Sequence, residues 1–130
     1  MKHHKPFERK FNDLYAGVFY ACVDKKNRLF IPSILEKTIV YRNQRSNIED
    51  LETVVISPGK NGISCYDALY YYANKENINH EKIYVSKLDF QRRLQVPKEV
   101  NSLYPLSSKV SISASKKGDY FIIKNQETKK

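Results

Sequence analysis

The sequence predicts an α+β domain, mainly β with short helices, built on an internal repeat. The segment 24–32 recurs at 89–97, with Asp, Arg, Leu and Pro at matching positions that lie 65 residues apart. Signals for a short helix and then a β-hairpin follow each copy, so the repeat extends beyond the shared motif. With 130 residues, 41% of them hydrophobic, the chain has enough apolar surface for one buried core.

The repeat suggests how the chain is divided. We expect a basic flexible arm at 1–12, a single domain at 13–125 and a polar tail at 126–130. Within the domain, the two repeats cover 13–80 and 81–125. The arm is expected to be basic because it holds four Lys or Arg residues against one Glu.

The first repeat opens with a strand, a turn and a second strand. Residues 15–23 are rich in β-branched and aromatic side chains that roughly alternate with small ones, which predicts a strand. A turn follows, because Asp24 can accept hydrogen bonds from the backbone ahead of it and Asn27 tolerates positive φ. Residues 28–31 are predicted to be the return strand.

Pro32 marks the end of that strand. It has no N–H and fixes φ near a helical value, which predicts a short helix over 33–37. The segment 41–52 is polar and charged and is predicted to be a loop. A hairpin follows, with strands at 54–56 and 63–66 around a Gly-containing turn.

Asp67 predicts the start of the next helix, because its carboxylate can cap the first backbone N–H groups. This helix is expected to run to about residue 77. Its three tyrosines at 70–72 cannot share one helix face, so one or two should dock on the sheet and the others should lie at its edge. The second repeat is predicted to contain a strand at 82–88, a turn at 89–92, a return strand at 93–96, a helix at 97–103 and a last hairpin from 110 to about 124.

The charge of the chain indicates a class of partner. The formal net charge is +9 and the pI is near 9.5. Nucleic acid is the first interpretation of such a basic domain, a soluble Lys-rich surface without a partner is the second, and an anionic membrane is a distant third. No apolar run approaches the roughly 20 residues of a membrane helix. No apolar segment follows the basic N-terminus, so we expect no membrane partner and a cytoplasmic location.

The sequence contains no pattern typical of an enzyme. We find no nucleophile–base pair, no carboxylate constellation and no phosphate-binding loop, so neither catalysis nor a cofactor nor a metal is expected. Cys22 and Cys65 lie in predicted strands, where buried reduced thiols are favoured over a disulfide.

The spacing D-x-x-x-R-L-x-[IV]-P occurs twice in register, each time followed by a hairpin, and it resembles the MraZ family of bacterial transcriptional regulators. More broadly, it is similar to the swapped-hairpin class that also contains AbrB-like regulators and antitoxins. The resemblance spans about residues 14–124. It implies a double swapped-hairpin β-barrel of two interleaved halves related by a pseudo-two-fold axis, with both motif turns on one face toward double-stranded DNA. It also implies a homo-oligomer, commonly a ring, associated with the nucleoid.

The chain departs from that family at three points. The family usually has Gly before the motif Arg, where this chain has Asn27 and Arg92. A left-handed turn costs Asn little but strains Arg. We therefore expect the second turn either to change shape or to offer Arg92 as an extra phosphate contact. The chain also lacks room for the family's closing helix, and its connection between the two copies is shorter than usual.

The two turns are predicted to form one basic face. The resemblance carries the motif positions onto Asp24 and Arg28, and onto Asp89 and Arg93. A guanidinium fork can grip a phosphate or the O6/N7 edge of guanine, and Lys supplies charge to the phosphate backbone. The two Asp side chains are expected to brace the turns and orient the Arg side chains, the alternative being simple surface salt bridges. The predicted DNA-binding residues are Lys25, Lys26, Arg28, Lys87, Arg92 and Arg93.

The predicted function is that of a sequence-specific DNA-binding transcriptional regulator. The alternative is a protein-interaction module of the AbrB and antitoxin class that has lost DNA binding. Arg92 in place of Gly and the missing final helix favour the alternative slightly.

Overall fold

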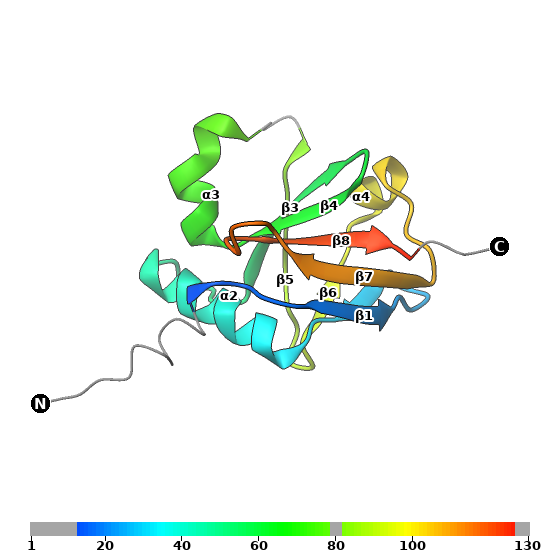
Figure 1. Ribbon diagram of the computed structural model, residues 1–130, viewed down its shortest axis with the longest axis horizontal. Helices are drawn as coiled ribbons and strands as arrows, with labels where there is room; N and C mark the ends of the chain where they lie inside the picture. The colour runs from blue at the N-terminus through cyan, green and yellow to red at the C-terminus, as the bar shows by residue number, and fades with distance from the viewer. Residues whose placement is uncertain (1–12, 79–81, 127–130) are drawn as a thin grey trace, which may run out of the picture.

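A computed structural model describes residues 13–78 and 82–126 of the chain (Figure 1). The predicted arm at 1–12 lies outside the described residues, as does the predicted tail apart from Gln126. The strands are β1 (Val18–Cys22), β2 (Arg28–Phe30), β3 (Thr53–Gly59), β4 (Gly62–Tyr66), β5 (Tyr84–Lys87), β6 (Arg93–Gln95), β7 (Lys109–Ala114) and β8 (Phe121–Asn125). The helices are α2 (Ser33–Arg45), α3 (Ala68–Asn74), the 3₁₀ helix η1 (Lys75–Asn77) and α4 (Lys98–Leu103).

Six of these strands form one antiparallel sheet in the order β1-β7-β8-β4-β3-β5, and β2 pairs with β6 in a separate two-stranded ribbon. This confirms the prediction of a mainly β fold with short helices. A closed barrel is not seen among the described residues, because β1 and β5 stand at opposite edges of the sheet. In Figure 1, α2 and α3 lie toward one end of this sheet and α4 lies toward the other.

Strands from the two predicted repeats are interleaved in the sheet, in the order first, second, second, first, first and second repeat. The edge strand β1 pairs with β7 of the later repeat, and β5 pairs with β3 of the earlier one. The ribbon joins β2 of one repeat to β6 of the other, and β4 pairs with β8 at the centre of the sheet. The return strand after the first turn therefore pairs mainly across the repeats, although an isolated bridge, Val23 to Leu29, also links it to its own repeat.

The core lies between the inner face of the sheet and a layer made by the ribbon, α2 and α4. Alternate residues point inward along each strand, as Val54 and Ile56 do on β3, and Leu29 and Leu94 enter the same core from the ribbon. The outer face of β3 is used as well, since the buried Val55 lies near Ala68 of α3.

The helix α2 is longer than predicted, and the predicted loop at 41–52 is wrong for its first five residues. The helix buries Leu35, Ile39, Arg42 and Asn43 on one face. Two of these side chains, Arg42 and Asn43, are polar, so the second half of the helix has no apolar stripe by which it could be predicted. Their burial depends on partners: Asn43 Nδ2 donates to the carbonyls of Leu51 and Thr53.

A buried polar cluster joins α2 to the start of α3 and to the N-terminal segment. Asp67 is fully buried, and one carboxylate oxygen accepts from Arg42 Nε and from the Tyr15 hydroxyl, both at 2.6 Å. Its other oxygen accepts from the Tyr70 N–H, which confirms the predicted helix cap. Burial, with the Asp67 charge beside it, raises the pKa of Tyr15 well above its usual value of 10.0.

The tyrosines of α3 and the two cysteines differ in how far they are buried. Tyr70 is half-buried and stacks on Tyr66, whereas Tyr72 is exposed. Cys65 is buried as expected. Cys22 is exposed, so that prediction is wrong, because the edge position of β1 leaves its outer face uncovered. Both thiols are free.

Candidate nucleic-acid interface

The first turn (residues 24–27) is closed by one carboxylate. Oδ1 of Asp24 accepts hydrogen bonds from the backbone N–H groups of Lys26 and Arg28, both at 2.9 Å. Oδ2 accepts from Nε of Arg28 at 2.9 Å. The backbone closes the same turn, because the Asp24 N–H donates to the Arg28 carbonyl. A single side chain thus fixes both the turn and the direction of the guanidinium group.

The second turn (residues 89–92) repeats these contacts one by one. Oδ1 of Asp89 accepts from the N–H groups of Gln91 and Arg93 at 2.8 and 2.9 Å, and Oδ2 accepts from Arg93 Nε at 2.8 Å. Backbone hydrogen bonds of Asp89 and Arg92 close this turn as their counterparts close the first. The two motifs are therefore the same local structure built from different intervening residues.

These contacts lower the pKa of both carboxyl groups from the usual value of 3.8. The largest cause at Asp24 is the backbone hydrogen bond from Arg28, and at Asp89 it is the one from Arg93. Each carboxylate is stabilised in its charged form, so both turns remain braced at neutral pH.

The residue before each motif Arg has left-handed backbone geometry, with φ of 61° at Asn27 and 62° at Arg92. The second turn has therefore kept its shape although Arg stands where Gly would be unstrained. Cross-strand bonds hold both residues: the Ile31 N–H donates to the Arg92 carbonyl at 2.8 Å, and the Val96 N–H donates to the Asn27 carbonyl at 2.9 Å. Each turn is thus anchored to the opposite repeat.

Arg28 and Arg93 lie on the same side of the molecule. In the ribbon Leu29 is paired with Leu94, and both are buried, so the residues on either side of each point away from the core. We call the outward side chains Arg28, Phe30, Arg93 and Gln95 the ribbon face. The side chains of Arg28 and Arg93 are 25% and 22% exposed. The two turns lie at the two ends of this ribbon, about 14 Å apart at 3.4 Å per residue over four steps.

The other predicted cations differ in whether an acidic side chain pairs with them. Lys25, Lys26 and Arg92 are exposed at the turns. The ammonium group of Lys87 instead pairs with Asp50 at 3.0 Å, in the connection between α2 and β3. Across the two turns and the ribbon, five cations stand against two carboxylates, which leaves a net charge of about +3.

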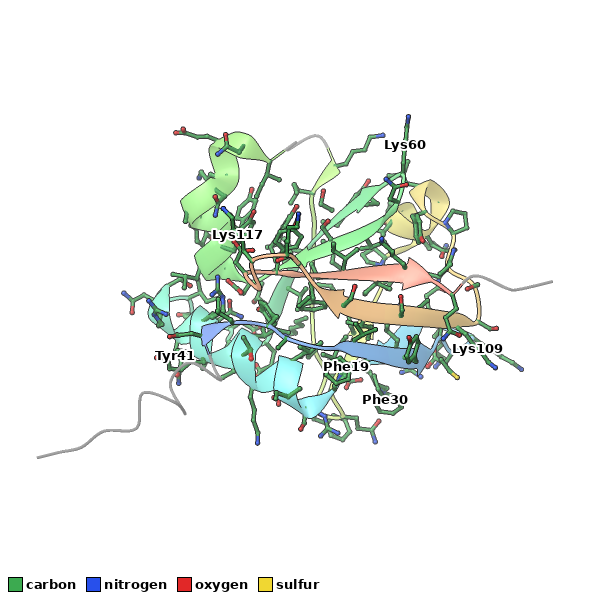
Figure 2. The ribbon with its side chains drawn as sticks, in the orientation of Figure 1. Phe19, Phe30, Tyr41, Lys60, Lys109 and Lys117 are labelled. Atoms are coloured by element: carbon green, nitrogen blue, oxygen red, sulfur yellow. The ribbon has the colours of Figure 1, made fainter. Side chains whose placement is uncertain are left out.

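Three residues of this surface were not predicted from the sequence: Phe30, Phe90 and Gln95. Phe30 is 57% exposed opposite Arg93, and Phe90 is 91% exposed in the second turn. Gln95 Nε2 donates to the Lys26 carbonyl at 2.6 Å and ties the ribbon to the first turn. Strand alternation would have pointed Phe30 and Gln95 outward, had the pairing of β2 with β6 been known. In Figure 2, Phe30 lies at the periphery, on the opposite side of the molecule from Lys60.

A shallow groove of about 500 Å³ adjoins the ribbon face. Tyr20 and Phe30 contribute aromatic rings to its wall, and Arg92 stands at its rim. At the positions that correspond to these two rings, the other repeat has Val85 and Gln95. The groove thus belongs to one half of an otherwise symmetric surface.

Comparison of the chain with protein-family models and with curated proteins gives no match. In the described part of the chain, no group of three or more His, Cys, Asp or Glu side chains is placed to hold a metal ion. None of the helices within 13–78 and 82–126 is long and apolar enough to cross a membrane.

Proposed function

We propose that the protein is a sequence-specific DNA-binding regulator that contacts the duplex through the ribbon face and the two turns. The observation that carries this proposal is the placement of Arg28 and Arg93. Both guanidinium groups lie on one outward face, each held by its own Asp in the same hydrogen-bond pattern. A single Asp–Arg pair would be an ordinary surface salt bridge, worth roughly 0–1 kcal/mol. Two identical pairs at both ends of one ribbon are better explained by a shared ligand.

The chemistry of this face suits the major groove of DNA. A two-stranded β-ribbon is narrow enough to enter that groove, and Arg side chains there can grip guanine O6 and N7. Lys25, Lys26 and Arg92 at the turns would neutralise phosphates on the groove walls. Pairing across the repeats supports a variant of the swapped-hairpin fold with an open sheet, and we expect several copies to associate on DNA, as members of the MraZ family do.

Salt dependence of binding tests the electrostatic part of the proposal. Three exposed cations that make no ion pair among the described residues give a slope of about −2.7 in a plot of log affinity against log salt concentration. Affinity for a random duplex should then fall at least roughly 40-fold between about 50 and 200 mM salt. Binding that does not respond to salt, or no binding to any duplex, would refute DNA binding through this face.

The groove beside Tyr20 and Phe30 favours a second candidate, a protein-interaction module. Exposed aromatic rings next to a guanidinium group are common at the centres of protein interfaces. Selection of bound duplexes from a random pool separates the two functions. An interaction module would yield no enriched sequence, whereas the regulator would yield one. Light scattering on the same sample, with and without DNA, gives the number of copies.

A further inference from the structure

The two turns have the same framework but present different chemistry at their tips. Adding 65 to each position sets Lys25 against Phe90, Lys26 against Gln91 and Asn27 against Arg92. One end of the ribbon face is therefore cationic and hydrophilic. The other end combines the rings of Phe30 and Phe90 with two guanidinium groups. The two ends of the ribbon face therefore differ chemically, although the backbone of the two turns is the same.

The side chain of Phe90 projects into solvent from a turn that hydrogen bonds make rigid. Its side chain is 91% exposed, more than any other large hydrophobic side chain among the described residues. The residues on either side are fixed, because the Asp89 carboxylate accepts from Gln91 and Arg93, and the Arg92 N–H donates to the Asp89 carbonyl at 2.9 Å. The ring contributes little to the core, so its apolar surface is available to a ligand at low ordering cost.

We propose that Phe90 reads thymine in the bound duplex by packing on the 5-methyl group in the major groove. This inference rests on the proposed function and deepens it. The major-groove edges offer one apolar group, the thymine methyl, and aromatic side chains are among its partners. Arg92 and Arg93, which follow Phe90 at the end of the second turn, would hold the adjacent phosphate or guanine. The recognised sequence is then directional, with thymine at the end that meets the second turn and no matching thymine requirement at the first.

Replacement of thymine by uracil removes only the methyl group and tests the contact. The probe is the duplex that the full-length wild-type protein selects from a random pool, with each thymine replaced in turn by uracil. We expect one or two positions at which wild-type affinity falls about fourfold, the value for exposing one methyl-sized group. The Phe90→Ala variant should bind the unmodified duplex correspondingly more weakly and show no further loss with uracil.

Lys25→Ala is the matched control, since Lys25 occupies the same place in the first turn. It should weaken binding to all duplexes alike and keep the uracil effect. Both tip residues are exposed, so thermal melting should show that both variants fold. If wild type selects a duplex but no position responds to uracil, or if Phe90→Ala still responds, the thymine contact is refuted and DNA binding stands. If wild type binds no duplex, the proposed function itself is refuted.

Discussion

Replacement of both motif arginines should separate DNA recognition from folding. Bidentate contacts of Arg with a base contribute roughly 1–3 kcal/mol each, so the double variant Arg28→Ala, Arg93→Ala should lose roughly 2–6 kcal/mol of binding to a selected duplex. That corresponds to about a 30-fold to 10⁴-fold loss. Titration of a fluorescently labelled duplex, with random duplex as reference, measures this loss.

The same change should hardly affect stability. Each Arg pairs with a partly exposed Asp that keeps two backbone hydrogen bonds when the guanidinium is gone, so each pair contributes roughly 0–1 kcal/mol. For a domain of this size, the two losses lower Tm by no more than about 8 °C.

The control is Lys116→Ala with Lys117→Ala, which removes the same charge in the turn between β7 and β8. That turn lies at the opposite end of β1 from the first turn, so selected binding should change little. A double Arg variant that unfolds, or one that binds as the wild type does, would contradict the assignment of Arg28 and Arg93 to DNA recognition.

Three other perturbations follow from the structure. Asp67→Ala should cost about 3–5 kcal/mol in chemical denaturation, because it leaves the Arg42 guanidinium buried without its counter-charge; adding Arg42→Met should recover part of this loss. Arg92→Gly should raise the free energy of unfolding by up to about 1 kcal/mol by relieving the positive φ, while it weakens DNA binding. The pKa values of Asp24 and Asp89 are lowered in the folded state, so their bracing is fully present above the usual value of 3.8 and is lost as the pH falls through the lower folded values. The difference in Tm between wild type and the double Asp→Asn variant should be constant near neutral pH and should shrink below pH 3.8; a difference that changes between about pH 5 and 7 would contradict this.

Local patterns predicted individual elements well where a single residue decides the structure. Asp24 and Pro32 marked the turn and the end of β2, and Asp67 marked the cap of α3, since each acts on backbone groups a few residues away. The second half of α2 was missed because its buried face contains Arg42 and Asn43. Their burial depends on Asp67 and on carbonyls at the start of β3, which no local window contains.

The part of the candidate site that could be predicted is the part whose contacts are local in the sequence. Both turns could be found from the repeated motif, because Asp and Arg four residues apart form the contact within the turn itself. The outward direction of Phe30 and Gln95 required knowledge that β2 pairs with β6 across the repeats. The ion pair of Lys87 with Asp50 could not be predicted either, because the two residues are 37 positions apart in the sequence.

The interleaving of strands from the two halves also affects how the chain can fold during synthesis. Among the described strands, β1 has one neighbour in the sheet, β7, which begins at residue 109 and is synthesised long after β1. At translation rates of about 5–20 residues per second, β1 waits roughly 5–20 s for that neighbour. A nascent chain that ends before β7 holds the β3–β4 hairpin with an uncovered apolar face. Folding should therefore be completed in one late step, and a fragment cut between the repeats should aggregate instead of forming half of the domain.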